Sequence, residues 1–299
     1  MKNSINKIRT IAASACLLVL SACSSTQLYL LNSTLKIKAD HTVATDISFG
    51  SEAWQKLDVH IPNADTDADK PVLIFFYGGS WDSGNKEMYF FVADAFARLG
   101  YVVVIPDYLK YPEARFPDFM HDGAAAVAWV KNNIDQYGGD PSTIFIAGHS
   151  AGAHLGSLLL TDERYLQKYN LSPRDVLGFS GLAGPYNFTP KRATLKVIFG
   201  PEENYPKMQT SNFVNGNEPP MLLLHGAEDT TVGVFNQEIL ITALNETGNP
   251  STGALYPKLT HIGILMSLTP WLRKDSTTID DMDTFFKSLI DSSKHKVRL

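Results

Sequence analysis

The chain has 299 residues, a formal net charge of -5 and an ordinary globular composition, with 44% hydrophobic and 19% charged residues. These values exclude a disordered chain and a coiled coil, and the mild acidic charge argues against non-specific binding of nucleic acid. The length suits a single α/β domain.

The first 22 residues have the features of an export signal. Lys2, Lys7 and Arg9 precede the apolar run "IAASACLLVL", and the small residues of "LSAC" follow. A basic start with an apolar core too short to cross a bilayer predicts a signal peptide over residues 1–22. The ending resembles a bacterial lipobox, in which cleavage leaves Cys23 as a lipidated first residue. The alternative is an ordinary signal peptide that contains a cysteine by chance.

The same segment sets expectations for location and redox chemistry. Ser24 is not acidic, and the lipobox resemblance then implies an exported lipoprotein anchored in the outer membrane. The other cysteine, Cys16, lies in the part to be removed, which excludes a disulfide framework, a thiolate nucleophile and a Cys-ligated zinc in the mature chain. We expect a tether over residues 23–40 and one domain over residues 41–299.

Beyond the tether, apolar strand patterns alternate with helical spacing. The expected strands cover residues 45–50, 55–62, 71–79, 101–108, 143–150, 176–182, 221–226 and 252–257. The expected helices cover residues 86–99, 119–137, 151–160, 232–247 and 277–292. The first two strands form an antiparallel pair, and the later ones are continuous apolar runs. This pattern predicts a mostly parallel sheet with helices on both faces.

The stretch "IFIAGHSAGAHL" carries the first chemical motif. Gly148, Ser150 and Gly152 satisfy G-x-S-x-G at the point where a buried strand gives way to a helix. Small flanking residues allow the strained turn that exposes a serine nucleophile. The alternative is that the glycines serve the packing of a sharp turn and nothing else.

A serine nucleophile needs donors for the oxyanion that it generates. The amide of Ala151, directly after the serine, is one expected donor. The turn "YGGSW" after the strand at 71–79 offers Gly79 and Ser80 as further donors, with Gly78 shaping the turn. A plain turn at the end of a strand is the alternative interpretation.

The acid and the base should follow the serine in that order. Asp229 comes just after the strand at 221–226, with Glu228 as a solvated competitor, and His261 comes after the final strand. The other histidines precede the acid, lie in the C-terminal tail, or end a buried strand: His41, His60, His121, His149, His154, His225 and His295. We therefore expect Ser150, Asp229 and His261 to form a catalytic triad.

The stretch "DYLKYPEARFPDFMHDGAAAVAWVKNNIDQYGGDPSTIFIAGHSAGAHL" resembles the esterase/lipase family of α/β-hydrolases, in particular small bacterial esterases related to feruloyl and acetyl esterases that carry an HGGxW-type turn. The resemblance extends over about residues 54 to 290. It implies an α/β-hydrolase fold that needs no metal or cofactor. The family's nucleophile, acid, base and oxyanion turn fall on Ser150, Asp229, His261, Gly78, Gly79 and Ser80.

One residue departs from the family pattern, and one segment varies within it. Tyr77 stands where the family usually has histidine at the start of the oxyanion turn. The stretch between the strands ending at 182 and beginning at 221 is where the fold inserts a cap, and here it is short. Trp81, Tyr186 and Phe188 are candidate substrate-binding residues, together with Phe199; the alternative is that these aromatics belong to the core.

The sequence thus predicts a serine carboxylesterase that hydrolyses short or aromatic esters through an acyl-enzyme. Two alternatives remain at this point. The glycine-rich turn before Trp81 also resembles the kynurenine formamidase group, which implies amide or formamide hydrolysis on the same triad. A non-catalytic binding module on a hydrolase fold is the other, since fold does not imply function. The expected partners are a small ester and, through Cys23, a membrane; the oligomeric state is not indicated.

Overall fold

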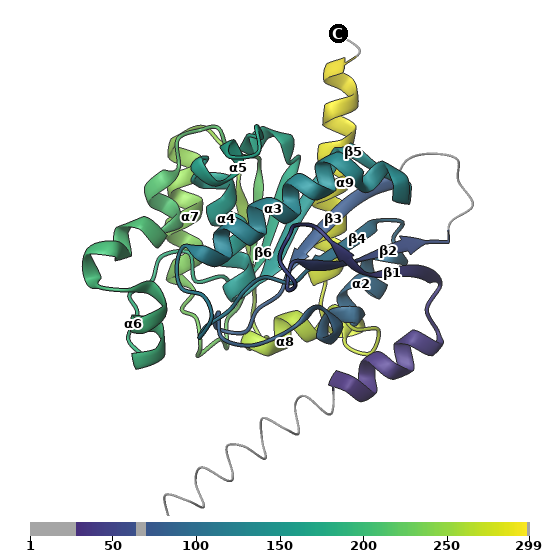
Figure 1. The fold of residues 1–299 in the computed structure, drawn as a ribbon, viewed down its shortest axis with the longest axis horizontal. Coiled ribbons are helices and arrows are strands. Elements are labelled where there is room, and N and C mark those ends of the chain that lie inside the picture. The colour runs from purple at the N-terminus through teal and green to yellow at the C-terminus, as the bar shows by residue number, and fades with distance from the viewer. Residues whose placement is uncertain (1–27, 64–69, 298–299) are drawn as a thin grey trace, which may run out of the picture.

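The computed structural model describes residues 28–63 and 70–297 and places eight strands in one sheet, in the order β1-β2-β4-β3-β5-β6-β7-β8 (Figure 1). The strands are β1 (His41–Ser48), β2 (Lys56–Pro62), β3 (Lys70–Phe76), β4 (Val102–Pro106), β5 (Gly139–His149), β6 (Gly178–Leu182), β7 (Met221–Gly226) and β8 (Thr252–Tyr256). β2 is antiparallel to both β1 and β4, and every later pair is parallel. The mostly parallel sheet predicted from the sequence is confirmed.

Helices connect these strands. They are α2 (Phe90–Ala97), α3 (Asp118–Asn133), α4 (Ala151–Thr161), α5 (Arg164–Gln167), α6 (Ala193–Phe199), α7 (Phe235–Glu246), α8 (His261–Met266) and α9 (Thr278–Val297). The sequence predicts the five longest of them. It misses α5, α6 and α8, because four to seven residues are too few to show a helical period.

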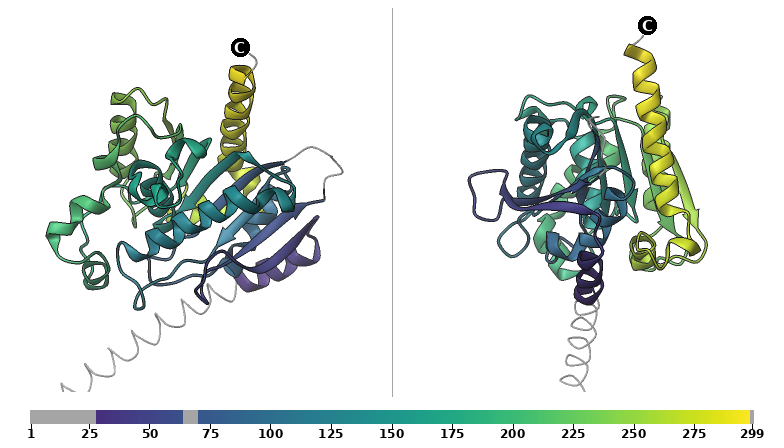
Figure 2. Two further views of the ribbon diagram at one scale, coloured as in Figure 1. Left: turned by 45° about the horizontal axis from the view of Figure 1, so that its top comes forward. Right: turned by 90° about the vertical axis from the view of Figure 1, so that its right-hand side faces the viewer.

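Both faces of the sheet are covered, as buried parallel strands require. Phe145 in β5 packs against Phe286 of α9, with ring centroids 4.4 Å apart. The next residue, Ile146, faces α4, where a Cβ on Gly156 would lie 3.0 Å from the Ile146 side chain. Figure 2 shows α9 on the opposite side of the sheet from α3 and α4. The alternation of side chains along β5 therefore contributes to two separate core layers.

The N-terminal part of the described chain differs from the expected tether. Residues 28–37 form a helix, and Leu35 on it is buried. The Asn32 side chain donates hydrogen bonds to the carbonyl oxygens of Glu87 and Met88 and accepts one from the amide of Phe91, at the start of α2. The folded unit therefore begins before residue 41, because this helix caps α2.

The predicted signal peptide (residues 1–22) and Cys23 lie outside the described residues. Among the residues that the structure does describe, no helix combines the length and the apolar character needed to span a bilayer.

The segment between β6 and β7, residues 183–220, is the expected cap. It contains α6 and two 3₁₀ turns, Glu202–Met208 and Thr210–Phe213, and α6 projects from one end of the molecule (Figure 1). Phe199, the last residue of α6, packs edge-to-face on Trp81, with ring centroids 4.8 Å apart. The cap is thus short and is attached to the domain by aromatic contacts.

Candidate active site

Ser150 occupies a strained turn between β5 and α4. Its backbone has φ of 54° and ψ of -120°, a conformation unfavourable for a residue with a Cβ. The turn is held by a hydrogen bond of 2.9 Å from the Ser150 amide to the carbonyl oxygen of Leu182. Gly152 lies directly against the Phe76 carbonyl, and a Cβ on Gly148 would lie 2.5 Å from the carbonyl oxygen of Gly152. The two glycines of the motif are therefore required by close backbone approach.

Three segments bring Ser150, His261 and Asp229 into one chain of hydrogen bonds. His261 Nε2 is 2.9 Å from Ser150 Oγ, and His261 Nδ1 is 2.8 Å from Asp229 Oδ2. Ser150 follows β5, Asp229 follows β7, and His261 begins α8 after β8. The carboxyl ends of parallel strands meet at one edge of a sheet, which explains why residues 111 positions apart can touch.

The surroundings of Asp229 favour its ionised form. The side chain is fully buried, and burial raises the pKa of the carboxyl group. Hydrogen bonds from His225, His261 and the amide of Val232 outweigh that effect and hold the pKa well below its usual range. An ionised Asp229 accepts the Nδ1–H of His261, which leaves Nε2 free to accept the proton of the serine hydroxyl.

Two histidines that the sequence assigns no catalytic role support this arrangement. His225 Nε2 is 2.9 Å from the carbonyl oxygen of Val232 and 3.3 Å from Asp229 Oδ2, which fixes the loop that carries the acid. His149 Nε2 donates to the carbonyl oxygen of His261 at 2.9 Å, and burial lowers the pKa of His149 to about 3. A neutral His149 thus anchors the backbone of His261.

The turn after β3 lies against the serine. A Cβ on Gly78 would be 3.1 Å from Ser150 Cβ, so the two loops are in contact. Gly79 and Ser80 have φ of 132° and 53°. Within the described residues, their amides donate to no other group, and the Gly79 carbonyl is occupied by the amides of Asp82 and Ser83. The turn therefore contacts the serine through Gly78 and carries two main-chain donors that have no partner among the described residues. Their role as oxyanion donors stays a prediction.

Tyr77, the residue that departs from the family pattern, is enclosed by two other tyrosines. Its ring stacks between those of Tyr89 and Tyr108, with centroids 5.1 and 4.8 Å away. The Tyr108 hydroxyl donates to the Tyr77 carbonyl oxygen at 2.8 Å, and the Tyr89 hydroxyl donates to the Gly78 carbonyl oxygen at 3.2 Å. Stacked tyrosines therefore hold the turn in place. Tyr89 and Tyr108 cannot be recognised as supports from the sequence, because nothing in their local pattern links them to this turn.

The hydroxyl of Tyr77 continues the network away from the site. It donates to Asp107 Oδ1 at 2.6 Å and accepts from Lys110 Nζ at 2.9 Å. Lys110 also donates to the Tyr108 carbonyl oxygen. A histidine at position 77 would be too short to make the same contacts, so this chain supports its turn with a different set of partners.

The candidate substrate-binding aromatics have different surroundings. Trp81 is almost wholly buried and stacks on the half-buried Phe188 at 5.5 Å, with 12° between the rings. The prediction for Tyr186 is wrong: it is only 1% exposed, and its ring packs against Gly181 and Gly184. The missing side chains of these glycines create the space that Tyr186 fills, which makes it a core residue.

Comparisons with known proteins agree with this geometry. The model of the BD-FAE family matches residues 57–244. The isoprenylcysteine alpha-carbonyl methylesterase ICME of Arabidopsis thaliana is 27% identical over 246 residues, which are 75% of this chain and 57% of that protein. The probable carboxylic ester hydrolase LipM of Mycobacterium tuberculosis is 29% identical over 225 residues, 67% of this chain and 51% of that protein. The chain thus spans a little over half the length of these curated relatives.

Solved structures show the same fold. A truncated carbohydrate esterase from gut microbiota superposes with a TM-score of 0.74 at 22% identity, covering 84% of this chain and 98% of that one. Esterase B from Lactobacillus rhamnosis superposes with a TM-score of 0.76 at 18% identity, covering 96% and 99%. The α/β-hydrolase fold predicted from the sequence is confirmed.

Proposed function

The chain belongs to the BD-FAE family of α/β-hydrolases, and from that premise we propose that it is a serine carboxylesterase with Ser150 as nucleophile, His261 as general base and Asp229 as the orienting acid. The observation that carries the proposal is the hydrogen-bond chain from Ser150 through His261 to Asp229, next to a turn with unpaired amides. Each part meets one requirement of acyl transfer.

In the first step, Ser150 Oγ attacks the ester carbonyl carbon while His261 Nε2 takes the hydroxyl proton. Asp229 keeps the imidazole in the required tautomer and stabilises its charged form. The carbonyl oxygen gains negative charge beside the amides of Gly79, Ser80 and Ala151, and each such donor contributes about 3 kcal/mol to transition-state stabilisation. His261 then returns the proton to the leaving alcohol.

In the second step, water releases the acid. His261 removes a proton from the water molecule, whose oxygen attacks the acyl carbon, and Ser150 recovers the proton as the acyl bond breaks. The short cap of residues 183–220 and the half-buried ring of Phe188 favour short or aromatic acyl groups over long lipid chains.

The test uses the domain from residue 24 to 299 with p-nitrophenyl acetate, butyrate and decanoate, and p-nitroacetanilide as the amide analogue. Ser150→Ala should lower the rate on acetate by about a thousandfold or more, whereas Ser288→Ala, a serine on the exposed face of α9, should leave it unchanged. Equal rates for wild type and Ser150→Ala would refute the proposal. Faster cleavage of the amide than of the esters would instead favour the amidase alternative.

We infer further that residues 1–22 direct export and that lipidation of Cys23 anchors the domain in the outer membrane of a bacterium. The inference is supported by the basic start, the short apolar core and the lipobox-like "LSAC". Cys23→Ala should move the full-length protein from the membrane to the soluble fraction and abolish labelling by a palmitate analogue. Membrane association that survives the substitution would contradict the anchor.

A further inference from the structure

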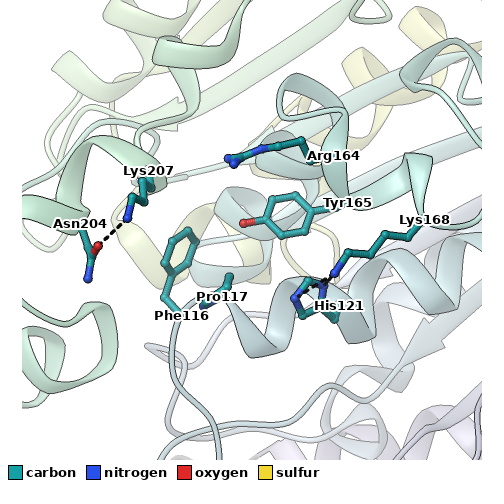
Figure 3. Close-up of a pocket in the computed structure, with 8 residues that line it drawn as sticks. All are labelled: Phe116, Pro117, His121, Arg164, Tyr165, Lys168, Asn204 and Lys207. Carbon is teal, nitrogen blue, oxygen red and sulfur yellow. Dashed lines mark hydrogen bonds between the residues drawn. The ribbon is translucent and has the colours of Figure 1, made fainter.

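A cleft that none of the triad residues lines lies between the start of α3, the helix α5 and the 3₁₀ turn Glu202–Met208. Its volume is about 370 Å³ (Figure 3). The residues that line it are Phe116, Pro117, His121, Arg164, Tyr165, Lys168, Asn204 and Lys207. Nothing in the proposed acyl-transfer mechanism uses any of them.

The charged side chains that line this cleft all have the same sign. Three of the lining residues are cations and none is acidic, although the whole chain has a net charge of -5. The guanidinium group of Arg164 is neutralised by Asp162, which it contacts through two hydrogen bonds of 2.8 and 2.6 Å. Lys168 and Lys207 are different, because in the described part of the chain their hydrogen-bond partners are all uncharged.

Those partners hold the two ammonium groups in place without neutralising them. Lys168 Nζ is 3.2 Å from His121 Nδ1, and Lys207 Nζ is 2.8 Å from Asn204 Oδ1. An ammonium group can only donate, so the imidazole of His121 accepts this hydrogen bond. Burial and the ammonium group of Lys168 lower the pKa of His121, and they outweigh Asp118 and Asp122, which raise it. Figure 3 shows these two pairs on opposite sides of the cleft. An anion in the cleft would therefore meet, on either side, an ammonium group whose direct hydrogen-bond partner is uncharged.

Aromatic rings lie between the cations. Tyr165 is 7% exposed and Phe116 is half-buried. The Tyr165 hydroxyl points toward the Phe116 ring (Figure 3) and has no hydrogen-bond partner among the described residues. A flat or chair-shaped ring could pack against these side chains while the Tyr165 hydroxyl donates to one of its oxygens.

The cleft is linked to the oxyanion turn by a layer of rings. Phe116 contacts Phe119 and Phe199, with centroid distances of 6.0 and 5.7 Å. Phe199 in turn packs on Trp81, which directly follows the turn residues Gly79 and Ser80. The cleft is therefore a separate site that shares one aromatic wall with the candidate active site.

We propose that this cleft binds a carboxylate carried on a ring, with the ammonium group of Lys168 or of Lys207 pairing with the carboxylate and with Phe116 and Tyr165 packing against the ring. Two sources fit this chemistry, an acidic sugar such as a uronic acid and an aromatic acid. The proposal goes beyond ester hydrolysis and does not depend on Ser150 being a nucleophile.

Calorimetric titration of the domain tests whether binding needs the carboxylate and whether it needs the ring. The four probes are galacturonate, benzoate, galactose and acetate. Galactose shares the sugar ring of galacturonate without its carboxylate, and acetate has the carboxylate without a ring. We expect galacturonate or benzoate to bind at millimolar concentrations or below, and galactose and acetate to bind at least about tenfold more weakly. The tighter of the first two probes identifies the source.

Matched variants locate the binding. Whichever of Lys168→Gln and Lys207→Gln removes the ammonium group that pairs with the carboxylate should weaken binding of the preferred probe by about tenfold, and Lys294→Gln, an exposed lysine on α9, should not. Phe116→Ala should also weaken binding, whereas Phe235→Ala, which removes an exposed ring elsewhere, should not. Both lysine variants should keep hydrolysis of p-nitrophenyl acetate, which separates this site from the triad.

The proposal would be overturned if neither galacturonate nor benzoate bound, or if both lysine variants bound the preferred probe as well as the wild type does. It would also be overturned if galactose bound as tightly as galacturonate, or if acetate bound as tightly as the preferred ring acid. Loss of esterase activity in Ser150→Ala with carboxylate binding intact would support both proposals. Absence of esterase activity in a wild-type domain that still binds the ring acid would refute the proposed function alone.

Discussion

The hydroxyl of Tyr89 donates a hydrogen bond to the carbonyl oxygen of Gly78, and that carbonyl belongs to the same peptide unit as the amide of Gly79. A hydrogen bond on one end of a peptide unit polarises the other end and fixes its plane. Burial raises the pKa of Tyr89 to about 12, so the hydroxyl remains a donor over the working range. Tyr89 thereby positions and strengthens a donor of the proposed oxyanion site.

Tyr89→Phe should lower kcat on p-nitrophenyl butyrate by about three- to tenfold with little change in KM, because the lost interaction acts on charge that develops in the transition state. Tyr101→Phe is the matched control, since it removes a buried hydroxyl that bonds Asp283 far from the site. A rise in KM at constant kcat would show that Tyr89 shapes substrate binding instead.

Asp229→Asn should reduce kcat by on the order of ten-thousandfold while the fold is retained, because an amide cannot hold the His261 tautomer that leaves Nε2 free to accept. Steady-state kinetics would be measured beside a circular dichroism spectrum. Glu228→Gln, at the neighbouring exposed acid, is the control and should retain full activity. A comparable loss of kcat in both variants would contradict the assignment of Asp229 as the acid of the triad.

Gly152→Ala should prevent folding or cost more than about 3 kcal/mol of unfolding free energy, since the new Cβ would overlap the main-chain carbonyl of Phe76, which cannot move without shifting β3. Gly248→Ala makes a useful comparison, because nothing lies near its Cβ and only its φ of 81° is strained, at about 1–2 kcal/mol. The measurement is urea unfolding. Equal losses of unfolding free energy in the two variants would mean that the turn at Ser150 accommodates a Cβ at position 152 despite the predicted overlap.

The protein should lose stability as the solution is acidified. Burial lowers the pKa values of His60 and His149 to about 3 and that of His154 to about 4, below the ordinary value of 6.5. The unfolded chain therefore binds more protons than the folded one below about pH 6.5, and each histidine costs about 2 kcal/mol of stability by pH 5.

Thermal unfolding between about pH 7.5 and about pH 5 measures this effect. Tm should fall on acidification, and the fall should be smaller in His60→Asn than in the wild type, because one of the groups that binds a proton on unfolding is gone. A Tm that is independent of pH over this range would contradict the prediction.

Asn32→Ala should destabilise the domain by about 1–2 kcal/mol, because the amide at the start of α2 and two carbonyl groups lose their partner together. A truncation that begins at residue 41 should be less stable still, since it also removes the buried Leu35. Ser33→Ala, on the exposed side of the same helix, is the control for unfolding measurements. Equal stability of the truncated and longer domains would show that residues 28–37 act only as a tether.

Local patterns in the sequence predict the strands, the longer helices and three candidate residues, Ser150, Asp229 and His261. The strands and longer helices are confirmed because each depends on neighbours along the chain: apolar runs form buried strands, and G-x-S-x-G marks a strand-to-helix turn. The roles of the three residues stay a prediction. The order of serine, acid and histidine along the chain then identifies His261 as the candidate base among eight histidines. The hydrogen-bond distances that join the three residues come only from the structure.

Other features depend on contacts between distant segments, which no local pattern encodes. The support of the turn by Tyr89 and Tyr108, the burial of Tyr186, and the docking of residues 28–37 on α2 each join parts of the chain that the sheet order brings together. The cationic cleft likewise forms from three separate segments. The sequence alone indicated the strands, five of the helices and the residues with reactive side chains, but not α5, α6, α8 or the helix of residues 28–37. The tertiary structure decided which of them meet, because strand order and helix packing set the neighbours of each side chain.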